Sequence, residues 1–420
     1  MNQLAVHGGE PVRDSFLVFG KPAIEQSEID EVVDCMNVGW LGTGPKVHKF
    51  ENNFRNYIGC QNAVAVNSCT AALHLALVVS GIGVGDEVIT TPMTFCATAN
   101  VILHVGATPV FADIDVETMN IDPAEIEKKI TSRTKAIIPV HFAGRPCKMD
   151  VIWQIAKKYN LLVIEDAAHA IESEFQGKKV GNIGHITCFS FYSTKNLVTG
   201  EGGMVTLNND ELTNKIKVYA LHGMDKDAWK RYSDQGFKHY QVVAPGYKYN
   251  MMDIQAAMGI HQLERLEKNW LRRQEIWQKY NKAFADLPVI TPRYVDAGDK
   301  HAYHLYTLLI DKDKCGIDRD NFQQYLFKEN IGTGIHFTAL HLHEYYKNTF
   351  GYNQGDFPKA EYISDRTISL PLAANLTDKD VADVICAVRK VLEETNIQKF
   401  QIQKSDDENE TRTGSIGILG

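Results

Sequence analysis

The sequence has no long hydrophobic segment and no excess of positive charge. Its 420 residues carry a formal net charge of −8, and no basic stripe is interleaved with aromatic residues, which argues against nucleic acid as a partner. No uncharged apolar stretch is long enough to span a bilayer, and residues 1–10 lack the apolar core of a signal peptide. We therefore expect a cytoplasmic protein that has neither a membrane nor a nucleic acid as its partner.

The sequence also lacks the common metal and phosphate motifs. None of its eight cysteines forms a CxxC pair, and most lie in apolar runs, as reduced core cysteines do. There is no GxxxxGKS/T, GxSxG or HExxH motif. His336, His341 and His343 lie close together, but no cysteine or carboxylate joins them at ligand spacing. We therefore expect no metal ion and interpret these histidines as polar loop residues near a substrate.

Short apolar runs rich in β-branched residues alternate with helical stretches between residues 62 and 207. The runs are residues 63–66, 87–91, 109–113, 136–141, 161–166, 186–191 and 204–207. They are continuously apolar, as strands buried on both faces are. The pattern predicts an α/β domain with a mostly parallel sheet and helices on both of its faces.

The flanking segments predict the rest of the organisation. In the lead-in, residues 1–60, a helix is expected from Ser27, its N-cap, to Asn37, and its apolar residues recur at helical spacing: Ile29, Val32, Val33 and Met36. The remaining boundaries are a large domain over residues 61–263, a small α+β domain over 264–400 and a flexible tail over 401–420. Residues 252–285 read as two helices meeting near Asn269, residues 304–310 as a strand, and residues 378–394 as a closing helix.

Lys195 is the most informative single residue. It follows the apolar run 186–191 and precedes the glycine-rich turn 200–203, so its amine should be partly desolvated and nucleophilic toward carbonyls. The alternative is a lysine whose amine reaches solvent from a loop. Asp166 is the last residue of the run 161–166, and α/β proteins bind ligands at such strand ends. The alternative is that Asp166 caps a helix starting at Ala167. His169 would then share a face of that helix with Asp166.

An acid at the end of one buried strand and a lysine after another is the arrangement that a pyridoxal phosphate enzyme needs. The lysine forms a Schiff base, and the carboxylate keeps the pyridine nitrogen protonated, so that the ring accepts electrons. Residues 67–73 follow a strand and open a helix. Their backbone amides could bind a phosphate, or Ser68 and Thr70 could simply cap the helix.

Several motifs together resemble the DegT/DnrJ/EryC1/StrS sugar aminotransferases over residues 10–395. They are Asn67–Thr70, Pro92–Phe95, Glu165–His169, Ser190–Lys195 and Gly246–Asp253. The resemblance implies the pyridoxal-phosphate-dependent fold type I, with a mostly parallel seven-stranded sheet in the large domain. Within the family, residues 221–223, 227–229 and 244–250 look most like members that make UDP-4-amino-4-deoxy-L-arabinose.

The resemblance also implies a role for individual residues. Lys195 would bond to the cofactor and move the proton, Asp166 would pair with the pyridine nitrogen, and His169 would lie beside the ring hydroxyl. Further cofactor contacts would come from Phe95 on the ring face and from the phosphate-binding residues Cys69, Thr70, Ser190 and Asn250. Relatives commonly have Gly or Ala where this chain has Cys69. Asn250 would reach the cofactor of a second subunit, which implies a homodimer with shared active sites.

The implied reaction moves an amino group from L-glutamate, which leaves as 2-oxoglutarate, to a nucleotide-linked keto sugar, at C4, for glycan or lipid A type amino sugars. The sugar would contact Trp40, Leu41, Thr43 and His336. Lys46, Arg231 and Lys248 are candidates for holding the diphosphate.

Three alternatives remain open. Members that dehydrate the sugar carry histidine in place of the lysine, so Lys195 disfavours that branch. Other members aminate a keto-inositol or build an aminobenzoate unit, and a regulatory member would retain only the fold.

Overall fold

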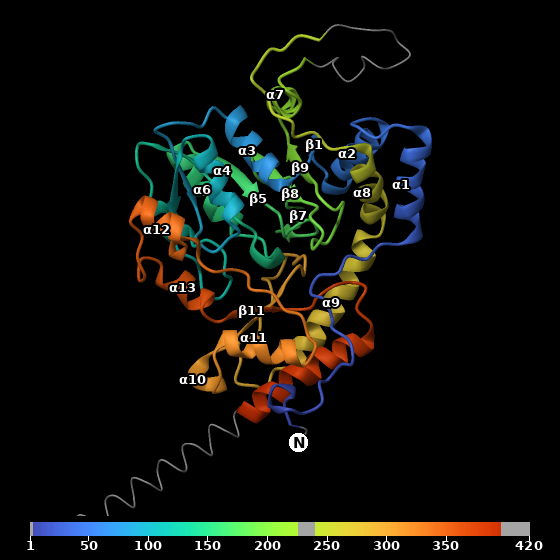
Figure 1. Cartoon of the computed structure of the whole chain (residues 1–420). Coiled ribbons are helices and arrows are strands. Elements are labelled where there is room, and N and C mark those ends of the chain that lie inside the picture. Colours follow the sequence, from blue (N-terminus) through green and yellow to red (C-terminus); the bar gives the residue numbers. More distant parts are fainter. Residues whose placement is uncertain (1–2, 226–239, 396–420) are drawn as a thin grey trace, which may run out of the picture.

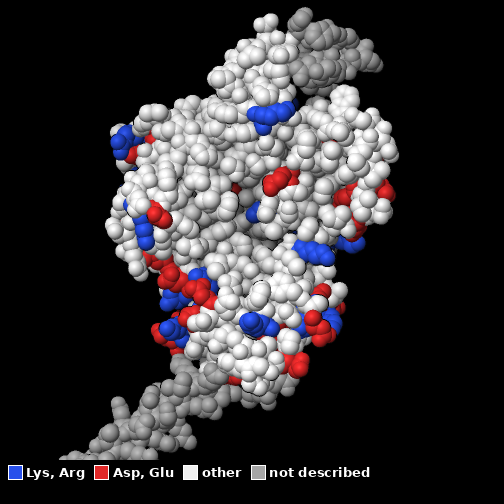
Figure 2. Space-filling model, in the orientation of Figure 1, with Lys and Arg blue, Asp and Glu red and all other residues white. Residues whose placement is uncertain are grey.

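The chain forms two lobes, a larger one around a seven-stranded sheet and a smaller one around a two-stranded sheet (Figure 1). The computed structural model describes residues 3–225 and 240–395. The long helix α9 (Leu266–Ala283) runs from the larger lobe into the smaller one. The surface is hollowed between the lobes, and charged side chains of both signs gather over the smaller lobe in this view (Figure 2).

The large sheet has the strand order β1-β9-β8-β5-β4-β2-β3. Its strands are β1 (Asn62–Val66), β2 (Glu87–Thr90), β3 (Thr108–Phe111), β4 (Thr134–Ile137), β5 (Leu162–Asp166), β8 (Ile186–Ser190) and β9 (Gly203–Leu207). Only β9 runs antiparallel to its neighbours within this sheet. Each of the apolar runs in the sequence contains a strand, so the predicted sheet is confirmed.

Helices cover both faces of the sheet because successive strand residues point to opposite sides. Val64 and Val66 of β1 pack in one cluster with α3 (Cys69–Val79), α4 (Cys96–His104) and α7 (Asp210–Ala220). Ala63 and Ala65 pack on the other side. The helices of that side are α2 (Pro45–Ile58), α5 (Pro123–Lys128), α6 (Met149–Tyr159) and α8 (Asp253–Glu264). This arrangement is the predicted α/β class.

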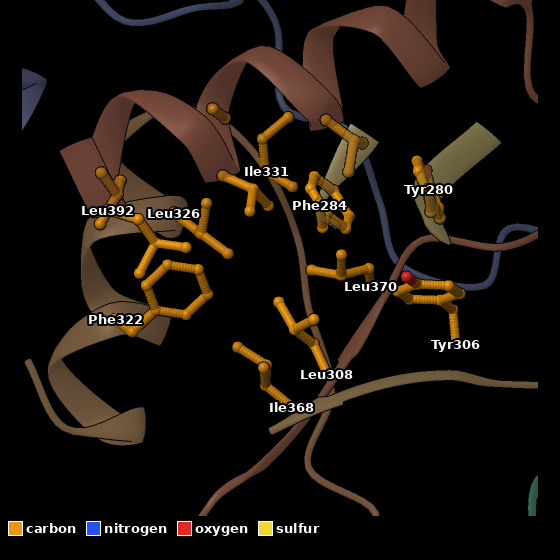
Figure 3. Close-up of a cluster of buried hydrophobic side chains, with 14 of the residues drawn as sticks. Tyr280, Phe284, Tyr306, Leu308, Phe322, Leu326, Ile331, Ile368, Leu370 and Leu392 are labelled. Carbon is orange, nitrogen blue, oxygen red and sulfur yellow. The ribbon is translucent and has the colours of Figure 1, made fainter. Parts of the chain in front are cut away.

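The small lobe is built on the antiparallel pair β10 (Tyr306–Leu309) and β11 (Thr367–Leu370). Phe322, Leu326 and Leu370 lie in its core beside residues of the closing helix, which covers residues 378–395 (Figure 3). The helices α10 (Lys312–Cys315) and α11 (Arg319–Lys328) also belong to this lobe. Leu4 from the N-terminal segment also belongs to this core. The helices α12 (Glu344–Phe350) and α13 (Pro358–Ser364) pack in one cluster with Phe111 of β3 in the large lobe.

The first helix, α1 (Gln26–Val38), differs from its prediction at its start. Its N-cap is Glu25, which forms a capping box with Glu28, and not Ser27. The residues at helical spacing are largely uncovered: Ile29, Val33 and Met36 are 48%, 41% and 55% exposed. Glu28 is buried and forms an ion pair with Arg265 after helix α8. The covered face of this helix therefore carries a charged contact to a distant part of the chain.

Two other expected helix features were wrong. The break between α8 and α9 lies at Arg265, four residues before the expected Asn269. No helix follows β5, because residues 167–170 form a turn in which the Ala170 amide donates to the Ala167 carbonyl at 2.9 Å. The tail 401–420, the segment 227–229 and Arg231 lie outside the described residues. Within the described ranges, no helix is both long and apolar enough to cross a membrane.

Candidate active site

Lys195 lies in the loop after β8, where a turn joins its amide to the Tyr192 carbonyl at 2.8 Å. The side chain is partly buried. Burial lowers the pKa of its amine to about 8, although the nearby Cys69 and Asp166 act in the opposite direction. This agrees with the desolvation predicted from the apolar flanks. An amine with this pKa has an appreciable neutral fraction near pH 7 and can act as a nucleophile or a base.

Asp166 ends β5 and is 5% exposed. Its Oδ2 accepts a hydrogen bond from Thr98 Oγ1 at 2.8 Å, and its Oδ1 accepts one from the Ala168 amide at 3.1 Å. Since no helix begins at residue 167, the helix-capping alternative was wrong, and so was the idea that Asp166 and His169 share a helix face. Burial raises the pKa of Asp166, while these bonds and the charge of Lys195 act in the opposite direction.

The surroundings of Asp166 fit a pyridoxal phosphate ring. Among the described residues, its carboxylate forms no ion pair within 4.0 Å. A buried carboxylate is costly to ionise without a positive partner. A protonated pyridine nitrogen would be such a partner, and the Lys195 amine lies near enough for its charge to act on Asp166.

His169, His304 and His336 lie near enough to the Lys195 amine for its charge to lower the pKa of each. Burial is the larger cause in each case, and it brings the pKa of His336 to about 4. His169 Nδ1 accepts the Ala143 amide at 3.3 Å. Because His169 is neutral and its Nδ1 accepts this bond, its proton lies on Nε2, where it is available as a donor. His336 Nδ1 lies 2.9 Å from Ser369 Oγ.

Three of the predicted phosphate residues, Cys69, Thr70 and Ser190, converge at the start of α3. Ser68 Oγ accepts the Ala71 amide at 3.1 Å, so Ser68 is indeed the helix N-cap. Ser190 pairs in register with Gly203, and a Cβ added to Gly203 would lie 2.7 Å from the Cys69 nitrogen. Cys69 Sγ donates to the Cys188 carbonyl at 3.6 Å, and Thr70 is exposed. The last residue of β8, the first residue of β9 and the loop before α3 therefore lie next to one another.

Phe95 immediately precedes α4 and is 60% exposed. Its ring centroid lies 6.2 Å from that of Phe337, which in turn stacks on His169 at 6.0 Å. These aromatic side chains form one wall beside the histidines. An exposed ring in this position can stack on a planar ligand.

A second group of predicted residues lies around a cavity that Lys195 does not line. Asn250 Nδ2 donates to Thr43 Oγ1 at 2.7 Å, and Trp40 Nε1 donates to the Thr43 carbonyl at 3.2 Å. Leu41 is 46% exposed. A cavity of about 240 Å³ is lined by Thr43 and Asn250 but not by Lys195. The Oδ1 atom of Asn250 is buried there and has no hydrogen-bond partner among the described residues.

The remaining candidate ligand residues have other partners. His341 Nε2 lies 2.9 Å from Glu361 Oε1, and His343 caps α12. No group of three or more His, Cys, Asp or Glu within the described part of the chain could hold a metal ion. Lys46, a candidate for the diphosphate, forms ion pairs with Glu31 and Asp34. Lys248 is exposed.

Comparison with known proteins shows the family to which the chain belongs. The model of the DegT/DnrJ/EryC1/StrS aminotransferase family matches residues 22–389. The chain belongs to this family. The DegT/DnrJ/EryC1/StrS proteins are pyridoxal-phosphate-dependent sugar aminotransferases of fold type I, so the predicted family, fold, enzyme class and cofactor are confirmed.

The most similar relatives span nearly the whole chain. MJ1066 of Methanocaldococcus jannaschii, an uncharacterised protein, is 55% identical over 383 residues, covering 91% of this chain and 99% of MJ1066. The spore coat polysaccharide biosynthesis protein SpsC of Bacillus subtilis is 51% identical over 381 residues, covering 90% of this chain and 98% of SpsC.

Solved structures of the family share the fold. Spr1654 of Streptococcus pneumoniae, in its PMP form, has a TM-score of 0.84 and 34% identity, covering 91% of this chain and 99% of Spr1654. DesI, solved in the presence of its TDP-sugar product, has a TM-score of 0.83 and 30% identity, covering 95% of this chain and 98% of DesI.

Some residues of the site were missed from the sequence. Thr98 donates a hydrogen bond to Asp166, and the rings of His304 and Phe337 pack against His169. Asn196, next to Lys195 in the chain, donates to Glu172. Asn196 was visible as the neighbour of Lys195, but its side-chain partners are 24 and 108 residues away. No local pattern indicates such contacts.

Proposed function

We propose that the chain transfers an amino group from L-glutamate to the C4 keto group of a nucleotide-linked sugar, as a cytoplasmic homodimer that makes amino sugars for surface glycans. The observation that carries this is the set Lys195, Asp166 and His169 around one buried site in a sugar aminotransferase family. The TDP-sugar named with DesI supports a nucleotide-linked substrate. The spore coat polysaccharide named with SpsC supports a glycan product.

The residues present would hold pyridoxal phosphate at four points of its ring and at its phosphate. Lys195 would bond to it, and the Asp166 carboxylate would accept a hydrogen bond from its ring nitrogen. His169 would donate its Nε2–H to the ring oxygen, and Phe95 would stack on the ring. The phosphate would lie at the start of α3, against the residues Cys69, Thr70 and Ser190, where the backbone amides of a helix N-terminus favour anions. Cys69 can serve there through its backbone amide.

Lys195 would move the proton. When bound, pyridoxal phosphate supplies an electron-accepting ring that stabilises negative charge on the substrate carbon. Near neutral pH, an amine with a pKa of about 8 can take a proton from that carbon and deliver it to the C4′ carbon of the cofactor. Asp166 favours the protonated ring because its buried carboxylate gains a positive partner.

The sugar would lie between His336 and the residues Trp40, Leu41 and Thr43. His336 lies in the Lys195 environment, whereas Trp40 and Thr43 form hydrogen bonds in a group with Asn250, and Thr43 and Asn250 line a cavity that Lys195 does not line. The two groups could meet if Asn250 and the Trp40 loop serve the site of a second subunit. The buried and unpartnered Oδ1 of Asn250 supports a further contact for this side chain.

The deciding experiment supplies the purified chain with glutamate and a panel of 4-keto nucleotide sugars. We expect one or more sugars to gain an amine, identified by mass spectrometry and NMR, together with stoichiometric 2-oxoglutarate. Keto-inositols and the 4-keto sugar without its nucleotide serve as matched comparisons. Amination of a keto-inositol alone would overturn the proposed substrate, and pyridoxal phosphate binding without transamination of any amino acid would overturn the proposed activity.

A further inference from the structure

A chain of buried polar contacts connects helix α9 to the residue after Lys195. Arg273 on α9 is 3% exposed and forms an ion pair with Glu172, which is fully buried. Glu172 Oε2 accepts a hydrogen bond from Asn196 Nδ2 at 2.9 Å, and the Ala302 carbonyl accepts a second from the same nitrogen at 3.0 Å. An amide nitrogen has two hydrogens, and both are used here. The orientation of the Asn196 amide is therefore fixed, since its reversal would turn the amide oxygen toward a carboxylate.

This orientation determines the tautomer of His304. The Asn196 Oδ1 atom lies 3.0 Å from His304 Nδ1. An amide oxygen only accepts hydrogen bonds, so His304 Nδ1 must carry the hydrogen. His304 is 6% exposed, and burial holds its pKa well below the usual range, so the ring is neutral. Its Nε2 atom then carries a lone pair.

His304 lies directly against His169. Their ring centroids are 4.4 Å apart with an interplanar angle of 37°. His169 itself has one polar anchor among the described residues, the Ala143 amide at 3.3 Å, which is a long hydrogen bond. The rotation of the His169 ring therefore depends on its packing, and His304 is the ring closest to it.

We infer that His304 is a positioning residue of the cofactor site: Asn196 fixes it as the Nδ1–H tautomer, and its ring fixes the direction in which His169 presents its Nε2–H. The inference rests on the proposed function, because the partner of that Nε2–H is the ring oxygen of pyridoxal phosphate. The pair Glu172 and Arg273 acts through Asn196, and the charge of Arg273 also helps to lower the pKa of His304. Removing His304 should loosen the cofactor and slow turnover without changing the sugar contacts.

The tautomer is testable in the cofactor-free protein by NMR of ¹⁵N-histidine-labelled chain. The His304 signals are those that disappear in His304→Phe. We expect a protonated Nδ1 and an unprotonated Nε2 in the unaltered chain, and a mixture of both tautomers in Asn196→Leu. A protonated Nε2 in the unaltered chain would overturn the inference even if Asn196→Leu did not fold.

The positioning role is testable with His304→Leu and a matched control, His301→Leu. His301 is also a buried histidine, 5% exposed and stacked on Tyr303 at 5.0 Å, but no described contact joins it to His169. We expect His304→Leu to weaken pyridoxal phosphate binding and lower kcat, each roughly ten-fold, with KM for the sugar unchanged. His301→Leu should lose stability with unchanged cofactor affinity.

Equal losses of cofactor affinity in both variants, or no loss in His304→Leu, would overturn the positioning role. If His304→Leu does not fold, His304→Gln replaces it with the same expected losses, since Gln keeps a polar side chain but has no ring beside His169. Failure of the proposed function can be told apart from failure of the positioning role, because in the first case the unaltered chain itself would bind no cofactor or transaminate no sugar.

Discussion

Thr98 on helix α4 donates a hydrogen bond to Asp166 at the end of strand β5, with 2.8 Å between Thr98 Oγ1 and Asp166 Oδ2. Thr98 is fully buried, and its hydroxyl also lies 2.9 Å from that of Thr94. A neutral donor on a buried carboxylate favours its ionised form. The bond therefore helps to keep Asp166 charged in a place where burial opposes the charge.

The first prediction concerns this bond. Thr98→Val removes the hydroxyl at nearly constant volume, so it should raise the pKa of Asp166 further and lower kcat by about ten-fold or more. Because Asp166 must be ionised to act, the acid limb of the pH–rate profile should move to higher pH. Thr98→Ser keeps a hydroxyl and serves as the control. A Thr98→Val enzyme with the parent's rate and pH profile would disprove the role.

The second prediction is a pH dependence of stability in the cofactor-free chain. The Lys195 amine has a pKa of about 8, below the ordinary 10.5. Below pH 8 both folded and unfolded chains bind the proton, and the folded chain bears the full cost of burying the charge. Between pH 8 and 10.5 the unfolded chain binds more protons, so stability from this group rises with pH. Lys195→Met should raise the free energy of unfolding at pH 7, by up to about 3 kcal/mol, and the gain should vanish near pH 10.5.

Lys46→Met is the control for that measurement. The Lys46 amine forms ion pairs with Glu31 and Asp34, and these raise its pKa. Its removal should lower the free energy of unfolding at pH 7, opposite in sign to Lys195→Met. Urea unfolding of both variants at several pH values gives the comparison. The same sign for both would contradict a desolvated Lys195.

The third prediction concerns Gly203 at the start of β9. A Cβ there would lie 2.5 Å from the Ser68 carbonyl carbon and 2.7 Å from the Cys69 nitrogen, both backbone atoms. Gly203→Ala should therefore displace the loop before α3, with a loss of roughly 1–3 kcal/mol in stability and weaker binding of the cofactor phosphate. Gly42→Ala meets no atom within 4 Å and is the control. Unchanged pyridoxal phosphate affinity in Gly203→Ala would show that the phosphate lies elsewhere.

The fourth prediction tests the shared site. Lys195→Ala and Asn250→Ala should each lose most transaminase activity, the first by roughly 10²–10⁴-fold as proton transfer fails. If Asn250 serves the other subunit, a hybrid dimer of the two variants contains one site with both native residues. Refolding the two variants together should therefore restore activity that neither has alone. No recovery in verified hybrids would assign Asn250 to its own subunit.

The sequence by itself determined the features that depend on neighbouring residues. Continuous apolar runs indicated the strands of the large sheet, because a strand between two helical layers needs apolar residues on both sides. The position of Asp166 at a strand end, and of Lys195 in a partly desolvated loop, also followed from flanking residues. The motifs then indicated the family.

Only the tertiary structure decided which distant residues meet. The covered face of α1 includes the ion pair between Glu28 and Arg265, which no helical periodicity reveals. The chain after Asp166 forms a turn rather than a helix, and the Asp166 carboxylate bonds to Thr98, 68 residues before it. His304 reaches Asn196 across 108 residues. Such contacts are set by how whole elements pack, and the same local sequence is compatible with many packings.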